Sequence, residues 1–388
     1  MDLREQTMEY RKLKTINDYI RRSVNPAKSP DTLFEMYSVP IFETGHPEYL
    51  LGREIASNKT VVQKNDILLC KINPRINRVW IVADESENPN IASSEWIVVR
   101  SSKYNPEFLA WYFRSPRFKN LMTSEVTGIG GSLTRAQPKS VAEYPVPVLE
   151  KPEQDAIAII FNTVDTIIKK RRKQLQKLDE LVKARFVELF GDPISNPHGF
   201  EKVDLSELAD IKIGPFGSLL HKEDYIEGGY ALLNPSHIID GKIAPDSKLT
   251  VSREKYEELS AYHLKAGDVV MGRRGEMGRC AVVPCDGYLC GTGSLLIRTK
   301  GDVTADYIQK IISFPSFKKA IEDMAVGQTM PNLNVPIVSR FQIIKPPIEI
   351  QHSYYAFVEQ TDKSKVAVQK ALDEAQLLFD SLMQKYFG

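Results

Sequence analysis

The chain is poor in cysteine and has no long apolar run. Its four cysteines among 388 residues include no Cys-x-x-Cys pair and no evident fourth zinc ligand nearby, which favours reduced, buried thiols over a metal site. No apolar stretch approaches the roughly 20 residues that a membrane-spanning helix needs. The first ten residues are rich in charge and do not resemble a secretory signal. These features predict a cytoplasmic protein without a membrane segment or a bound metal.

An excess of charge of one sign is also missing. The 51 Lys and Arg residues nearly balance the 50 Asp and Glu residues, and the net charge is +1. Bulk charge therefore does not indicate a nucleic-acid partner, and any such contact must come from local patches.

Catalytic and cofactor signatures are missing as well. The sequence has no Gly-x-x-x-x-Gly-Lys-[Ser/Thr] loop and no Gly-x-Gly-x-x-Gly after a predicted strand. Its glycine-rich segment 272–278 lies between predicted strands and opens no helix, so it is a poor phosphate cradle. The six histidines have no metal-ligand spacing. We expect no catalytic residue and no cofactor.

What the sequence does contain is an internal repeat. The pair Phe190-Gly191 recurs 197 residues later as Phe387-Gly388, and each pair closes a long helical segment. At the same offset several further residues align: Gly130 with Gly327, Gln154 with Gln351, Asp165 with Asp362, Leu175 with Leu372 and Leu181 with Leu378. A repeat of this length predicts two whole modules, each a globular part followed by a long helix.

Each globular part is predicted to be mixed α/β. Short β-branched runs bounded by turn formers indicate strands at 66–70, 79–82 and 96–99, and again at 267–271, 280–283 and 294–297. One helix is expected in each part, at 106–113 and 304–312, and each is followed by an expected turn at 115–118 or 314–317.

The two helical segments have apolar residues at alternating spacings of three and four, which is typical of a coiled-coil seam. The first seam is Phe161, Val164, Ile168, Leu175, Leu178, Val182 and Leu189, interrupted by Arg171 and Arg185. The second is Val358, Thr361, Lys365, Val368, Leu372, Ala375, Phe379, Leu382 and Tyr386. We expect the two helices to bury these seams against each other.

Polar and basic residues occupy the loop after a buried strand in each module. In the first module these are Lys71, Asn73, Arg75, Asn77 and Arg78, with Lys59 upstream; in the second they are Arg273, Arg274, Glu276 and Arg279. Arg can bind guanine, Asn adenine and Glu cytosine at the edges exposed in the major groove. The loops therefore predict contacts to DNA bases, although a solvated hairpin tip would have a similar composition.

The order of these features resembles the specificity subunit of type I restriction–modification enzymes. The resemblance is carried by Gly130 to Gln137, 146–154 and the helix to Gly191, and again by Gly327 to Asn334, 343–351 and the helix to Gly388. Gly214-Pro-Phe-Gly-Ser218, followed by 222–225, also looks like the start of a target-recognition domain in this family. The first module has no clear counterpart to Gly214-Pro-Phe-Gly217.

The resemblance implies an α+β fold. It would contain two mixed α/β target-recognition domains joined by two long antiparallel coiled-coil helices, related by a pseudo-two-fold repeat. The expected boundaries are 1–150 for the first domain, 151–191 for the central helix, 192–348 for the second domain and 349–388 for the C-terminal helix. It also adds Arg135, Ser218, Lys222, Asn332 and Asn334 to the expected DNA-binding residues.

The resemblance further implies a non-catalytic protein with three kinds of partner: double-stranded DNA, two adenine-methylating subunits and restriction/translocase subunits. Because the two basic loops differ in sequence, the two halves of the DNA site should differ. Helices of about 38 residues would span on the order of 57 Å, equivalent to at most roughly 17 base pairs. The alternatives are a stand-alone DNA methyltransferase or nuclease and a duplicated protein-binding scaffold.

Overall fold

The computed structural model describes residues 9–83, 85–124, 126–127, 134–325 and 332–388. The chain divides into two compact units: Met1–Gln174 with Val368–Gly388 form unit 1, and Leu175–Ala367 form unit 2. Each unit therefore combines one globular module with half of each long helix. Gly130 and Gly327, which align in the repeat, lie outside the described residues.

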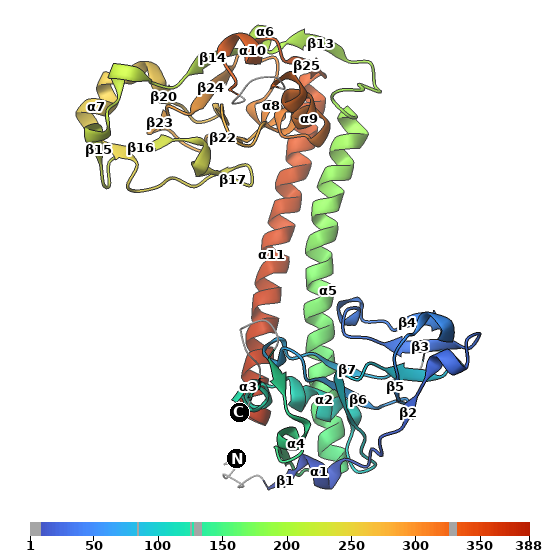
Figure 1. Ribbon diagram of the computed structural model, residues 1–388. Helices are drawn as coiled ribbons and strands as arrows, with labels where there is room; N and C mark the ends of the chain where they lie inside the picture. The colour runs from blue at the N-terminus through green and yellow to red at the C-terminus, as the bar shows by residue number, and fades with distance from the viewer. Residues whose placement is uncertain (1–8, 84, 125, 128–133, 326–331) are drawn as a thin grey trace. The chain divides into compact units, whose positions relative to one another are not determined.

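Unit 1 contains two main sheets and a helical layer. Its strands are β1 (Tyr10–Lys12), β2 (Ser23–Val24), β3 (Leu33–Tyr37), β4 (Glu48–Leu51), β5 (Lys59–Val61), β6 (Ile67–Cys70), β7 (Val79–Ile81), β8 (Asn90–Ala92), β9 (Trp96–Val99), β10 (Val126–Thr127), β11 (Arg135–Ala136) and β12 (Pro145–Pro147). Its own helices are α1 (Leu13–Ile16), α2 (Pro106–Arg114), α3 (Pro116–Ser124) and α4 (Pro138–Val141). One sheet has the order β2-β5-β8-β3-β4 and the other has the order β7-β6-β9. Figure 1 shows α2 beside β6 and β7.

Unit 2 repeats this plan. Its strands are β13 (Glu201–Asp204), β14 (Ala209–Ile213), β15 (Tyr225–Ile226), β16 (Tyr230–Leu233), β17 (Ile238–Ile239), β18 (Lys242–Ile243), β19 (Thr250–Val251), β20 (His263–Leu264), β21 (Val269–Gly272), β22 (Cys280–Val282), β23 (Tyr288–Cys290), β24 (Ser294–Thr299) and β25 (Gln342–Lys345). Its own helices are α6 (Leu205–Leu208), α7 (Arg253–Glu258), α8 (Ala305–Ile312), α9 (Pro315–Ala325) and α10 (Val335–Ser339). The sheet orders are β14-β24-β21-β22 and β15-β19-β16-β23-β20.

The pairing of strands follows the sequence repeat. In unit 1, β1 pairs antiparallel with β12, and in unit 2, β13 pairs antiparallel with β25. A parallel pair occurs once in each five-stranded sheet, between β3 and β8 and between β16 and β23. A buried aspartate at the start of the central strand binds an arginine with both oxygens in each unit. These pairs are Asp66 with Arg100, at 2.6 and 2.7 Å, and Asp268 with Arg298, at 2.7 and 2.6 Å.

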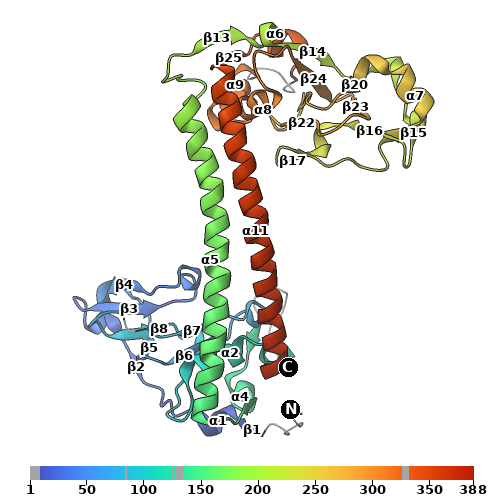
Figure 2. The ribbon, with the colours of Figure 1, turned by 180° about the vertical axis from the view of Figure 1, so that it is seen from behind.

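The long helices α5 (Lys151–Phe190) and α11 (Ile348–Phe387) have the predicted seams. Every seam position predicted from the sequence is buried or half-buried, including Arg171 and Arg185. In unit 1 the first half of α5 packs antiparallel on the second half of α11 (Figure 2). Phe161 packs against Phe387, and Arg172 lies near Gln376. In unit 2 the second half of α5 packs on the first half of α11, with Phe186 against Tyr354 and Asp179 paired with Lys365.

The helices after the central strands differ from the prediction in one respect. The segments 115–118 and 314–317 were expected to be turns, but each begins a second helix, α3 or α9. Pro116 and Pro315 are the first residues of these helices, where proline has no hydrogen bond to lose and its φ angle suits the helix. The expectation of a turn was therefore wrong, because proline also starts helices.

The two aligned glutamines hold the start of each long helix to the helix that follows the sheet. The Gln154 side chain accepts from the Asn105 N–H at 2.7 Å and donates to the Leu149 carbonyl at 2.8 Å. The Gln351 side chain accepts from the Thr304 N–H at 2.9 Å and donates to the Pro346 carbonyl at 3.0 Å. Both glutamines are buried, so each satisfies two backbone groups that have little access to water.

Replacing Gln351 by leucine should lower the free energy of unfolding by about 2–4 kcal/mol, because the Thr304 N–H and the Pro346 carbonyl would lose their partner. A urea titration followed by far-UV circular dichroism measures this change. Gln360→Leu, at an exposed position of the same helix, should change the free energy by no more than about 0.5 kcal/mol. Equal effects of the two substitutions would contradict the assigned role of Gln351.

Candidate nucleic-acid interface

The two basic loops connect equivalent strands in the two units. The loop of unit 1, residues 71–78, joins β6 to β7, and the loop of unit 2, residues 273–279, joins β21 to β22. In both units the strand that precedes the loop lies between its hairpin partner and a third antiparallel strand, β9 or β24. The sequence-based placement of the loops between strands is confirmed.

The first residue of each loop has the same backbone surroundings. The Lys71 N–H donates to the Glu95 carbonyl at 3.1 Å, and the Arg273 N–H donates to the Gly293 carbonyl at 2.9 Å. The carbonyl of Lys71 accepts from Ala136, and that of Arg273 accepts from Leu333, at 2.9 and 3.0 Å. These bonds bring the segments of Arg135 and Asn332 beside the loops. One backbone frame therefore carries different side chains in the two units.

A carboxylate that the sequence analysis did not identify lies among the cations of unit 1. Glu95 lies 3.4 Å from the guanidinium of Arg135 and 3.9 Å from the ammonium of Lys71, which also donates to the Ser94 carbonyl at 2.7 Å. Glu95 precedes β9 by one residue, and its contacts depend on two distant segments. The structure thus brings Lys71 and Arg135 together around one acidic group.

The remainder of the unit 1 loop is a tight turn that presents Arg75. Asn73 and Asn77 have φ angles of 48° and 53°, in the left-handed region that asparagine tolerates better than most residues. Pro74 and Arg75 lie between them in a short 3-10 helix, η4 (Pro74–Ile76). Arg75 is exposed and forms no ion pair or hydrogen bond with any described residue. Arg78, at the end of the loop, is half-buried.

In unit 2 the loop arginines differ in whether their side chains form hydrogen bonds within the protein. The Arg273 Nε donates to the Leu333 carbonyl at 3.0 Å, and burial, together with the neighbouring Arg274, lowers the pKa of Arg273. Arg279 donates to Glu276 and to the Pro235 carbonyl, at 2.8 and 3.3 Å. Arg274 is exposed and has no partner among the described residues. Arg274 in unit 2 and Arg75 in unit 1 are therefore the exposed loop cations whose side chains are available to a ligand.

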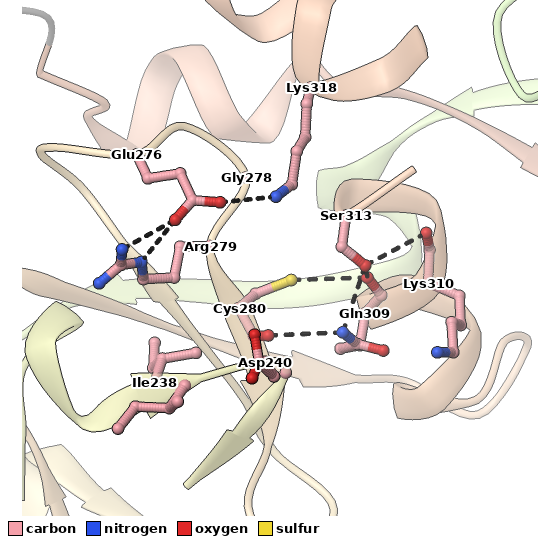
Figure 3. Close-up of a pocket in the computed structure, with 12 residues that line it drawn as sticks. Ile238, Asp240, Glu276, Gly278, Arg279, Cys280, Gln309, Lys310, Ser313 and Lys318 are labelled. Atoms are coloured by element: carbon pink, nitrogen blue, oxygen red, sulfur yellow. Dashed lines mark hydrogen bonds and ion pairs between the residues drawn. The ribbon is translucent and has the colours of Figure 1, made fainter. Parts of the chain in front are cut away.

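Glu276 was predicted to contact a base, but the structure gives its carboxylate two partners within the protein. Figure 3 shows it between Arg279 and Lys318 of α9, whose Nζ donates at 2.9 Å. Hydrogen bonds from Lys318 and Arg279 lower the pKa of Glu276 to about 2. Glu276 thus connects its own loop to α9 as a brace, and its contact to a base stays a prediction.

Replacing Glu276 by glutamine should accelerate amide hydrogen exchange in the loop 273–279 by about three- to tenfold, because two exposed ion pairs are lost. The folded-state pKa is depressed, so the contribution of the carboxylate is complete above its unfolded pKa and disappears as the pH falls towards 2. The difference in exchange should therefore be constant between pH 5 and 7. Glu258→Gln, which removes an exposed carboxylate paired with Lys255 outside the loop, serves as the control. Identical loop exchange in all three proteins would refute the brace.

A cleft of ≈ 400 Å³ lies beside this brace (Figure 3). Its walls include Asp240 from the turn between β17 and β18, Arg279 from the loop, and Lys310 and Lys318 from α8 and α9. Because Asp240 is acidic and the other three side chains are basic, the cleft offers charges of both signs next to the loop of unit 2. The described part of the chain contains no group of three or more His, Cys, Asp or Glu residues that could hold a metal ion.

Three of the predicted residues have other surroundings. Lys59 lies on β5, in the five-stranded sheet, and its buried ammonium donates to the Ser57 hydroxyl at 2.5 Å; burial lowers its pKa. Asn334 caps α10 by accepting from the Ile337 N–H at 3.0 Å. Asn332 is half-buried, and its side-chain oxygen has no partner within the described residues. Lys59 and Asn334 thus have structural contacts, whereas Asn332 retains an unused acceptor.

The Gly214-Pro-Phe-Gly217 segment lies beside the loop of unit 2. A Cβ at Gly214 would lie 2.0 Å from the Gly291 carbonyl oxygen, so the segment is packed on the chain that leads to Gly293, the acceptor of the Arg273 N–H. Phe216 is 63% exposed, and the sequence analysis did not single it out. Ser218 follows in the short 3-10 helix η5 (Gly217–Leu219), and Lys222 begins η6 (Lys222–Asp224), where it is exposed. The Gly214-Pro-Phe-Gly217 motif in the sequence could have drawn attention to Phe216 as an exposed aromatic residue beside the loop.

A family model matches the second of the two modules. Residues 197–375 match the model described as the type I restriction modification DNA specificity domain. This chain contains a type I restriction–modification DNA specificity domain. The specificity domain includes the loop 273–279, the segment 214–222 and most of α11.

Two solved structures extend the likeness to the whole chain. One is a type I restriction–modification S subunit from M. genitalium, with a TM-score of 0.58, 14% identity, and coverage of 100% of this chain and 98% of that one. The other comes from a study of complex assembly and conformational transition of the type I R-M system, with a TM-score of 0.60, 17% identity, and coverage of 100% and 99%. At these identities the likeness establishes the fold.

The resemblance drawn from the sequence is thereby confirmed: the specificity domain is recognised directly, and the fold of the whole chain is that of a type I S subunit. The expected fold of two mixed α/β domains with two long helices is confirmed by the same comparison. None of the helices in the described ranges, α5 and α11 included, has an apolar stretch suited to crossing a lipid bilayer.

Proposed function

We propose that this protein is the DNA-recognition subunit of a type I restriction–modification complex, that it performs no chemistry itself, and that each unit recognises one half of an asymmetric, bipartite site. The domain boundaries for this division are those expected from the sequence, with recognition domains at 1–150 and 192–348. The observation that carries the proposal is the repeated loop, in which one pattern of backbone hydrogen bonds holds Lys71 and Arg273 at equivalent positions.

The different loop side chains support the asymmetry of the site. Unit 1 offers Arg75 between two asparagines in the left-handed region, whereas unit 2 offers Arg274 beside an internally paired glutamate. Hydrogen bonds to base edges depend on the type and geometry of the donor, so two different loops select different bases. Lys59 and Asn334 are proposed only as residues that shape the surface, since the Lys59 ammonium and the Asn334 side-chain oxygen have partners within the protein.

The proposed partners follow from the same assignment. We propose that two adenine-methylating subunits and the restriction/translocase subunits assemble on this chain, which directs them to the site. One of the two similar solved structures comes from a study of complex assembly in the type I R-M system, and this supports the proposed partners.

The test is binding of the full chain, together with its modification subunits, to duplex DNA at several salt concentrations, with the target found by methylome sequencing. Neutralisation of several phosphates should make the logarithm of the binding constant fall linearly with the logarithm of the salt concentration. Binding that does not depend on salt, or methylation without a two-part motif, would contradict the proposal.

Arg274→Ala should weaken binding to the target by about 10- to 100-fold if Arg274 contacts a base, because a bidentate base contact contributes about 1–3 kcal/mol. The loss should be confined to targets that are correct in the half recognised by unit 2. A contact to phosphate alone would instead weaken all sequences equally and reduce the salt slope by about one. Arg253→Ala, at an exposed arginine of α7 paired with Glu257, is the matched control. Fluorescence anisotropy with the target and a scrambled duplex measures both effects, and identical behaviour of the two variants would exclude Arg274 from the interface.

A further inference from the structure

An apolar groove in unit 2 is lined by residues of α5, α8, α9 and α11 and of the turn between α8 and α9. Figure 1 shows where these helices lie in the unit. The groove has a volume of ≈ 340 Å³, and its walls include Val182, Phe186, Phe314, Pro315 and Tyr354. Two lysines, Lys183 of α5 and Lys310 of α8, stand at the groove and are exposed. Neither lysine forms an ion pair with a described residue. The groove is thus an apolar cavity with two lysines at its edge. Asp306, one turn before Lys310 on α8, interacts electrostatically with Lys310 but forms no ion pair with it.

The internal repeat identifies the equivalent place in unit 1. Asn105 and Thr304 are equivalent, because each caps its helix and donates its backbone N–H to the aligned buried glutamine. Lys310 lies six residues after Thr304, and Trp111 lies six residues after Asn105. At the offset of the long helices, Phe379 corresponds to Val182. At these two positions unit 1 has a tryptophan and a phenylalanine, whereas unit 2 has a lysine and a valine. Elsewhere in the groove lining the order is reversed, since Phe186 and Tyr354 of unit 2 correspond to Met383 and Ile157 of unit 1.

Unit 1 fills this place with its own indole ring. Trp111 is buried and stacks on Phe161, with ring centroids 5.6 Å apart. Its edge contacts the ring of Phe379 at 5.7 Å, and its Nε1 donates to Asn162 at 2.8 Å. Unit 2 has no ring at the equivalent positions, since Lys310 extends into solvent and Val182 is smaller than Phe379. The same helical framework therefore encloses an aromatic side chain in one unit and an open groove in the other.

We propose that the groove of unit 2 receives one aromatic side chain from an acidic segment of another protein. The aromatic group follows from unit 1, where the same framework accommodates an indole. The acidic flanks follow from Lys183 and Lys310, whose ammonium groups form no ion pair with a described residue and lie beside an apolar surface. A single aromatic anchor buried in a desolvated pocket is a common arrangement at protein–protein interfaces. The groove lies outside the basic loops, so the proposal stands whether or not the loops recognise DNA.

The test uses the full chain and a short acetylated peptide, Glu-Trp-Glu-amide, whose tryptophan carries a 5-fluoro label for ¹⁹F NMR. The peptide should bind saturably, and its unlabelled leucine analogue, measured by displacement of the labelled peptide, should bind at least about fivefold more weakly, because the aliphatic side chain fills less of the groove. Lys310→Trp supplies the ring that unit 1 has and should weaken binding by at least about tenfold. Val182→Phe, which copies Phe379, should do the same. Urea unfolding of both variants should match the wild type and so exclude a loss of fold.

The charge is tested separately. Lys183→Glu should weaken binding of the acidic peptide by about three- to tenfold, whereas Lys248→Glu, at another exposed lysine of unit 2, should have no effect. The proposal is overturned by the absence of saturable binding, by equal binding of the leucine analogue, or by undiminished binding to Lys310→Trp. A change from dimer to monomer in Lys310→Trp would also overturn it, since the occupant would then be a second copy of this chain.

Discussion

Replacing Phe387 by alanine is expected to lower the free energy of unfolding of unit 1 by about 3–5 kcal/mol. Phe387 is the last residue of α11, yet its ring lies in the core of the first module, 5.4 Å from Phe161 and 5.7 Å from both Phe108 and Tyr112. Alanine would leave a cavity among these rings, which belong to α2 and α5 and cannot close it easily. The end of the chain thus stabilises the module at its beginning.

Tryptophan fluorescence can isolate this effect. All three tryptophans, Trp80, Trp96 and Trp111, belong to unit 1, so their emission during a urea titration reports the unfolding of that unit. Leu378→Ala, at a half-exposed leucine of the same helix, should change the transition by no more than about 0.5 kcal/mol. An unchanged fluorescence transition in Phe387→Ala would show that α11 does not complete unit 1.

Phe190 provides the reciprocal experiment. It ends α5, and its ring packs in unit 2 against Tyr307 and Tyr354, at 5.1 and 5.5 Å. Phe190→Ala should therefore shift the transition measured by far-UV circular dichroism by a similar free energy. The tryptophan transition should move much less, because no tryptophan lies in unit 2.

Much of this fold could be predicted from the sequence because its signals are periodic or duplicated. The seams of α5 and α11 follow from the spacing of apolar residues, and the buried glutamines Gln154 and Gln351 were marked by their alignment at one offset. The central strands were visible as β-branched runs between turn formers. The start of α3 at Pro116 was missed, since Ser-Pro is compatible with both a turn and a helix N-terminus.

The state of each loop side chain could not be predicted, because its partners come from distant segments. Arg273 bonds to the carbonyl of Leu333, and Arg279 bonds to that of Pro235. Glu276 is paired with Lys318 of α9, 42 residues away. In the sequence Arg274 and Arg279 are equivalent members of one basic loop; only the structure distinguishes the exposed arginine from the paired one.

Exchange of residues 20–150 for the same segment of a related subunit should change one half of the methylated site completely and leave the other half intact. The loop 71–78 and Arg135 lie within the exchanged segment, whereas the loop 273–279 and the segment 214–222 lie outside it. If each unit recognises its own half-site, base specificity should follow the loops. Methylome sequencing of cells that carry the chimera and its modification subunit measures both halves at once.

The design of the chimera depends on the packing of unit 1. Phe108, Trp111 and Tyr112 lie inside the exchanged segment, but the rings they contact, Phe161, Phe379 and Phe387, lie outside it. A donor without these aromatic residues would disrupt the core, so residues 106–124 should be kept from the recipient when the donor differs there. Exchange of 106–124 alone, from a donor that has these aromatic residues, is the matched control: it replaces α2 and α3 but leaves the loop, and it should not alter the site. A chimera of 20–150 that changes both halves, or a control exchange that changes either half, would show that specificity does not reside in separate loops.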